Sequence, residues 1–160
     1  MAPKRILFVC TGNSCRSVMA EWLLRQALAR AGVQSVQTES AGVFAVAGMG
    51  PTRETLRVLQ EAGVDCSAHR ARMLTAEMVE DADLVLVMEP FQLEEILRRV
   101  PSARGKAHLL KAYQAQEGDP MDHLGIPDPI GKPMEVYEVC FAEIRDAIGR
   151  LVRGLGVASP

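Results

Sequence analysis

A short apolar run, Ile6–Val9, leads directly into the string C-T-G-N-S-C-R-S at residues 10–17. Apolar residues at helical spacing follow from Arg16 onward, so the string lies where a strand ends and a helix begins. Backbone N–H groups at such a turn converge on one point and bind phosphate-sized oxyanions. The string places Cys10 and Arg16 beside that point. The chain is therefore predicted to form an oxyanion-binding loop at the carboxyl end of its first strand.

Strand and helix segments alternate along the rest of the chain. Strands are predicted at 6–9, 36–40, 83–88 and 107–110, helices at 16–31, 52–62, 75–80, 92–99 and 134–155, and a long loop at 113–132. This order predicts an α/β fold of three layers: a four-stranded parallel sheet with helices on both faces and the phosphate-binding loop after the first strand. Ligands of such sheets bind at the carboxyl ends of the strands, where Cys10 lies. The last helix is predicted to bury an apolar side made of Val136, Val139, Cys140, Ile144, Ile148 and Leu151.

The bulk composition predicts one domain over residues 1–160 and excludes several classes of protein. A net charge of −2 does not favour a nucleic-acid-binding surface. No apolar run is long enough to span a bilayer, and four apolar residues before Cys10 are too few for a signal peptide, so we expect a cytoplasmic protein with no membrane partner. Its four cysteines are expected to be thiols, and without a C-x-x-C pair no metal or other cofactor is expected.

The residues of the loop suit a cysteine nucleophile. A cysteine becomes a thiolate at a helix N-terminus or beside a cation, and Cys10 has both. Gly12 and Asn13 tolerate backbone conformations that turn consecutive N–H groups inward. Arg16 can grip two phosphoryl oxygens with its planar fork, and Ser17 can donate a hydrogen bond to the thiolate. A lone cysteine after a strand is usually a packing residue, but the full string is far more specific.

The chain resembles the low-molecular-weight protein tyrosine phosphatases over nearly its whole length. The resemblance covers the loop and, in the family's order, the segments 19–21, 39–42, 63–65, 69–72, 82–88 and 127–129. It implies a protein phosphatase without cofactors that hydrolyses a phospho-amino acid through a phosphocysteine intermediate. The implied partners are a phosphorylated protein substrate and inorganic phosphate or another oxyanion in the loop, and a monomer or weak dimer is expected.

The resemblance also implies roles for individual residues. Cys10 resembles the nucleophile, Arg16 the residue that binds the phosphoryl oxygens, and Asp128 the general acid of the D-P motif. Ser17 resembles the hydroxyl partner of the thiolate, and Cys15 a neighbouring cysteine that traps Cys10 as a disulfide under oxidation. The supporting polar network is matched by Asn13, Ser40 and His69, and the phosphate-binding loop is completed by Thr11, Gly12, Ser14 and Cys15.

Several assignments have plainer alternatives. Asp128 could instead be only a turn residue, and Asp119 belongs to a second D-P pair nearby. The wider string I-P-D-P-x-G fits the family's motif better and favours Asp128 as the general acid. By spacing alone, His69 is an ordinary half-buried histidine. The remaining candidates receive packing or solvent roles: Cys66, Cys140 and Trp22 are expected to pack, Asp119 and Asp122 to be solvated, and His108 and His123 to have no role.

Three positions depart from the family's pattern. Val18 stands where proline is common, which costs little at a helix start. Ile130 stands where tyrosine-specific members carry an aromatic ring that stacks on the substrate. Ser14 stands where many of those members have a bulky aliphatic residue, and bacterial phosphoarginine phosphatases resemble this chain in having a small polar one. Phosphotyrosine and phosphoarginine therefore both stay open as substrates.

Two other classes of function are weighed against a phosphatase. Thioredoxin-coupled arsenate reductases share the loop, but their reaction needs further cysteines to relay a disulfide outward. Those cysteines are expected after the third strand, where this chain has none, and neither Cys66 nor Cys140 lies there. A non-catalytic phosphate-binding module would be expected to lack Cys10 or Asp128, and both are present.

Overall fold

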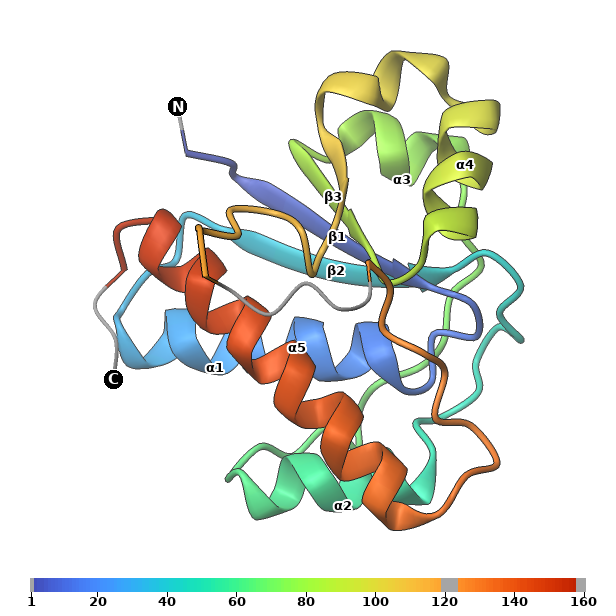
Figure 1. Cartoon of the computed structure of the whole chain (residues 1–160), viewed down its shortest axis with the longest axis vertical. Coiled ribbons are helices and arrows are strands. Elements are labelled where there is room, and N and C mark those ends of the chain that lie inside the picture. Colours follow the sequence, from blue (N-terminus) through green and yellow to red (C-terminus); the bar gives the residue numbers. More distant parts are fainter. Residues whose placement is uncertain (1, 119–123, 158–160) are drawn as a thin grey trace.

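A four-stranded parallel sheet forms the centre of the computed structural model, which describes residues 2–118 and 124–157. The strands are β1 (Arg5–Cys10), β2 (Gln37–Gly42), β3 (Leu84–Val87) and β4 (Ala107–Leu109), in the order β2-β1-β3-β4 (Figure 1). All neighbouring strands pair in parallel, so their carboxyl ends meet at one edge. The predicted sheet is confirmed.

Helices cover both faces of the sheet. They are α1 (Arg16–Arg30), α2 (Arg53–Glu61), α3 (Ala76–Asp81), α4 (Pro90–Arg99) and α5 (Met134–Gly154), with a short 3₁₀ turn at Pro101–Gly105 that was not predicted. Figure 1 shows α1, α2 and α5 below the sheet and α3 and α4 above it. The predicted three-layer α/β arrangement is therefore confirmed.

The central strand explains why its sequence reads as one apolar run. Ile6 and Phe8 pack into the core beneath α1 and α5, whereas Leu7 and Val9 pack into the core beneath α3 and α4. All four side chains are fully buried. Successive side chains of a strand point to opposite faces, so a strand covered on both faces needs apolar residues at every position. This burial fixes Cys10 at the carboxyl edge.

The end of the second strand and the buried face of the last helix differ from the prediction. β2 continues to Gly42 rather than ending at Ser40, because Ala41 and Gly42 still pair with Val9 and Cys10 of β1. In α5, Val136 and Val139 are 40% and 62% exposed and do not belong to the buried side. A helix turns about 100° per residue, so a stripe through residues 144, 148 and 151 runs back to 137 instead. The side chains buried there include Tyr137 and Phe141 as well as Cys140, Ile144, Ile148 and Leu151.

Local capping fixes where two of the helices begin. The Thr52 and Thr75 hydroxyls each accept a backbone N–H three residues on, at 3.2 Å, which satisfies a donor of the first turn of α2 and α3. α4 begins with Pro90 at its first position and a capping box between Glu89 and Gln92, two residues earlier than predicted. None of the helices in the described part of the chain is long and apolar enough to cross a membrane.

Candidate active site

The loop of residues 10–15 joins β1 to α1 around the side chain of Asn13. Asn13 adopts a left-handed backbone conformation, φ 53°, and its N–H points at Cys10 Sγ at 3.3 Å. Its side-chain Oδ1 accepts the Arg72 N–H at 2.9 Å, and His69 Nε2 contacts its carbonyl oxygen at 2.8 Å. His69 and Arg72, far away in sequence, therefore hold the strained point of the loop in place.

The hydrogen bonds around Asn13 have a defined direction. Its amide Nδ2 donates to Ser17 Oγ at 2.8 Å and to Ser40 Oγ at 2.9 Å. The Ser40 hydroxyl in turn donates a hydrogen bond to Glu21 Oε1 at 2.5 Å. Since Ser17 Oγ accepts from Asn13, its proton is left for Cys10 Sγ, 2.9 Å away. A donor aimed at sulfur favours the thiolate, because hydrogen bonds to an ionised acceptor are the stronger ones.

Gly42 is required because β2 passes directly beneath the loop. A Cβ atom at this position would lie 2.4 Å from the Thr11 carbonyl oxygen and 2.9 Å from the Asn13 nitrogen. The next two N–H groups, of Val43 and Phe44, donate to the carbonyls of Cys10 and Thr11 at 3.0 and 2.9 Å. Glycine therefore allows the backbone approach that supports the loop from below.

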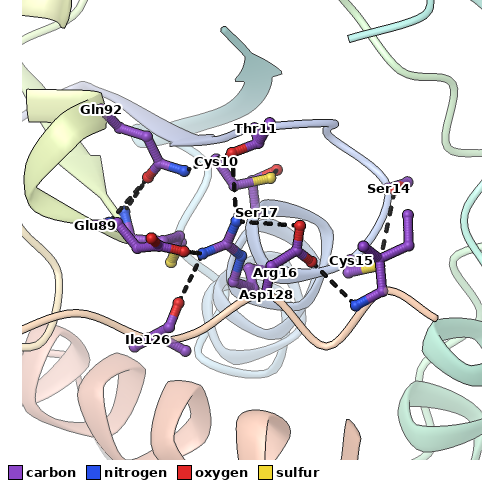
Figure 2. Close-up of polar contacts among 12 residues, drawn as sticks. Cys10, Thr11, Ser14, Cys15, Arg16, Ser17, Glu89, Gln92, Ile126 and Asp128 are labelled. Atoms are coloured by element: carbon purple, nitrogen blue, oxygen red, sulfur yellow. Dashed lines mark hydrogen bonds and ion pairs between the residues drawn. The ribbon is translucent and has the colours of Figure 1, made fainter. Parts of the chain in front are cut away.

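The Arg16 guanidinium lies at the centre of the site and is 1% exposed (Figure 2). On one side its Nη1 donates to the Ile126 carbonyl oxygen at 2.6 Å and to Glu89 Oε1. On the other side its Nη2 lies 3.6 Å from Asp128 Oδ2. Two carboxylates and a carbonyl thus offset the desolvation of a buried cation and fix the plane of its fork.

The start of α4 holds the loop at a second point. The Gln92 side-chain oxygen accepts the N–H groups of Met88 and Glu89, both at 2.9 Å. Its Nε2 donates to Thr11 Oγ1 at 3.2 Å. Glu89 and Gln92 therefore contact Arg16 and Thr11, the two sides of the loop, from one helix end. Sequence reasoning missed both residues, although Glu89 follows β3 at the sheet edge just as the loop follows β1.

Asp128 lies at the mouth of the site with 37% of its side chain exposed. Its Oδ1 accepts the Ile130 N–H at 3.1 Å, a local turn that holds the carboxylate over Arg16. The structure thus brings Cys10, Arg16 and Asp128 together from two distant parts of the chain. Asp119, Asp122 and His123 lie outside the described residues. His108, on β4, packs against Tyr113 with ring centroids 5.0 Å apart and takes no part in the site.

All four cysteines are free and buried, in different surroundings. Cys15 Sγ contacts Thr52 Oγ1 at 3.6 Å and the Tyr137 hydroxyl at 3.7 Å. Burial raises the pKa of Cys66 to about 11 and that of Cys140 to about 12, so both remain neutral thiols of the core, as predicted. The pairing of Cys10 with Cys15 under oxidation stays a prediction.

Trp22 packs against the same core, as predicted. No group of three or more His, Cys, Asp or Glu side chains that suits a metal ion is found within residues 2–118 and 124–157. Around one anion-sized point the site places the sulfur of Cys10, the guanidinium of Arg16 and the carboxylate of Asp128. These groups can transfer a phosphoryl group by covalent catalysis.

Residues 5–158 match the family described as low molecular weight phosphotyrosine protein phosphatase. The chain belongs to this family. It is a cysteine-dependent phosphatase, and its substrates are phosphorylated proteins.

Members of the family with two kinds of substrate resemble this phosphatase. It is 39% identical over 154 residues to the protein-arginine-phosphatase of Geobacillus stearothermophilus, covering 96% of this chain and 97% of the relative. It is 40% identical over 156 residues to the probable low molecular weight protein-tyrosine-phosphatase EpsP of Ralstonia solanacearum, covering 96% and 99%.

Solved structures of both kinds share its fold. The YwlE arginine phosphatase from Geobacillus stearothermophilus superimposes with a TM-score of 0.84 at 37% identity, covering 96% of this chain and 94% of that one. The tyrosine phosphatase Wzb from Escherichia coli K30, in complex with sulphate, superimposes with a TM-score of 0.85 at 34% identity, covering 98% and 100%.

Proposed function

We propose that this phosphatase removes the phosphoryl group from phosphoarginine in proteins and that Cys10, Arg16 and Asp128 perform the reaction. The observation that carries the choice of substrate is the small hydroxyl side chain of Ser14 in the loop. Residues 1–160 act in this reaction as one phosphatase domain, supported by the single sheet that both cores share. Its loop binds inorganic phosphate as product.

The reaction proceeds in two displacements at phosphorus. The Cys10 thiolate attacks, an S–P bond forms, and the bond between phosphorus and the side-chain nitrogen breaks while Asp128 gives its proton to that nitrogen. Water then attacks the phosphocysteine, Asp128 takes a proton from it, and the S–P bond breaks to release phosphate and the thiolate. Throughout, the loop N–H groups and Arg16 hold the negative phosphoryl oxygens, which is where the charge must be stabilised.

The role of Asp128 as general acid is tested by how strongly its loss slows substrates with different leaving groups. Asp128→Asn removes the proton but keeps the shape, so we expect kcat/KM to fall about 10²-fold for phenyl phosphate, whose leaving group needs protonation. The fall for p-nitrophenyl phosphate should be several-fold smaller, because its leaving group departs as an anion. The measurement is kcat/KM without added metal, because kcat also contains the hydrolysis of the phosphocysteine, which the two substrates share. An equal loss for the two substrates would assign the proton to another group.

Ser14 favours a guanidinium over a phenol as the leaving side chain. It is 6% exposed, and the contact found for its Oγ is a weak one of 3.7 Å with Cys15 Sγ. The hydroxyl oxygen has two lone pairs and is thus available to accept an N–H from an arginine side chain held in the loop. The bridging ester oxygen of phosphotyrosine carries no hydrogen and offers no such donor. The chain is about equally identical to a protein-arginine-phosphatase, 39%, and to a probable protein-tyrosine-phosphatase, 40%, so the choice of substrate rests on Ser14.

Phosphotyrosine is the second candidate, favoured by the exposed ring of Phe44. Phe44 is 67% exposed and its N–H is bonded to the Thr11 carbonyl of the loop. An exposed ring beside the loop is suited to stack on a phenyl group, a role that Ile130, 54% exposed, cannot fill. The similarity to tyrosine phosphatases supports this alternative.

Ser14→Ile separates the two candidates. We expect the variant to lose about tenfold in kcat/KM for a phosphoarginine peptide, because a hydrogen bond to a charged group is removed. Its kcat/KM for the matched phosphotyrosine peptide should change by less than about threefold. Ser14→Thr keeps the hydroxyl and is the control that should retain the arginine preference. A wild-type preference for phosphotyrosine would reject the arginine assignment and leave the phosphatase mechanism intact.

A further inference from the structure

A cavity of about 620 Å³ lies behind the catalytic loop and takes no part in the proposed reaction. Its walls are residues of α1, residues 36–40 at the start of β2, and the segment that carries His69 and Arg72. Ser40 and Glu21 border it, so the hydrogen-bond chain that starts at Cys10 ends at this cavity. Its volume is in the range of small-molecule sites.

Positively charged side chains outnumber negatively charged ones around the cavity. Three guanidinium groups and two carboxylates line it. Glu21 is already held by Arg25 at 2.7 Å and by the Ser40 hydroxyl. Arg70 and Arg72 donate to backbone carbonyls, of Ser67 and His69 and of Ser40, and neither forms an ion pair with a described carboxylate. Two cations therefore face the cavity without a carboxylate partner of their own.

Trp22 also borders the cavity, with its indole N–H buried beneath the wall. Its indole Nε1–H is buried and finds no hydrogen-bond partner in the described part of the chain. The Arg25 guanidinium lies over its ring, 4.8 Å from the centroid. The side chains that a ligand in the cavity can reach carry three guanidinium groups against the carboxylates of Glu21 and Glu39, and Glu21 is already paired with Arg25. The cavity therefore carries more positive than negative charge.

We propose that this cavity is a second anion site, which binds a small molecule through a phosphate or carboxylate group held by Arg70 and Arg72. The site is separate from the catalytic loop. Arg72 links the two, because its side chain borders the cavity while its backbone N–H holds the Asn13 side chain of the loop. An anion bound there touches the residues that position the nucleophile.

The chain carries a built-in reporter for this site, since Trp22 is its single tryptophan. Its indole N–H gives one resolved signal in a ¹H–¹⁵N spectrum, and the Gly12 amide reports separately on the catalytic loop. Inorganic phosphate and citrate are titrated in parallel, which distinguishes a phosphate-bearing ligand from a carboxylate-bearing one. We expect at least one probe to shift the Trp22 signal to saturation with an affinity different from that read at Gly12.

Two arginine variants decide the outcome. Arg70→Ala should weaken the Trp22 event about tenfold and leave the phosphate affinity at Gly12 unchanged. Arg104→Ala, an exposed arginine on the 3₁₀ turn, is the matched control and should alter neither event. The same spectra show whether each variant is folded. The proposal is overturned if neither probe shifts Trp22, or if the shift persists in Arg70→Ala. Either result leaves the proposed phosphatase reaction untouched, because the readout is binding and not turnover.

Discussion

Cys10→Ser is expected to lower turnover of p-nitrophenyl phosphate by about 10⁴-fold or more, the usual scale for loss of a catalytic nucleophile. The serine hydroxyl does not ionise at neutral pH, so neither the Ser17 hydroxyl nor the Asn13 N–H has a thiolate to stabilise. The fold should persist, because the two side chains are nearly the same size. Turnover is measured alongside the thermal unfolding midpoint.

Cys140→Ala is the matched control for that variant. Cys140 is also a buried thiol, but burial raises its pKa to about 12, so it carries no thiolate at neutral pH. Its replacement should leave turnover within about threefold of the wild type, while the loss of a buried sulfur lowers stability by roughly 1 kcal/mol. Residual activity in Cys10→Ser close to that of the control would mean that another group attacks phosphorus.

Arg16→Lys is expected to lower kcat on the order of 10³-fold, with a smaller change in KM. Lysine keeps the positive charge but replaces the planar fork with a single point charge. The fork of Arg16 is oriented by Glu89 and by the Ile126 carbonyl, and it lies 3.6 Å from Asp128. Those contacts orient the guanidinium fork toward the point where the phosphoryl oxygens carry charge. Replacing the fork therefore destabilises the transition state more than the bound substrate.

The control for Arg16→Lys is Arg104→Lys, the same exchange at an exposed position. It should leave both kcat and KM unchanged. If Arg16→Lys raised KM with kcat unaffected, Arg16 would contribute ground-state binding alone, and the role of transition-state stabiliser would have to be withdrawn.

Local patterns in the sequence were sufficient for the loop and for the layers of the fold. The unbroken apolar run Ile6–Val9 and the glycine and asparagine after it predict a buried strand followed by a turn, and distant residues such as Arg72 and Gln92 then hold that turn in place. The same reasoning failed for α5, where Val136 and Val139 are exposed. Periodicity alone is compatible with more than one buried face on a helix. Which of these faces is buried depends on the elements against which the helix packs.

The sequence by itself determined that Cys10 and Arg16 share one loop, because seven consecutive residues bring them together. Only the tertiary structure decided what surrounds that loop. Glu89 and Ile126 reach Arg16 from 73 and 110 positions away, and Glu21 reaches the loop through Ser40. The parallel sheet gathers these distant residues, because the carboxyl ends of all its strands lie at one edge. Contacts of that kind leave no local signal in the sequence, so the oriented guanidinium and the cavity behind the loop became visible only in the folded chain.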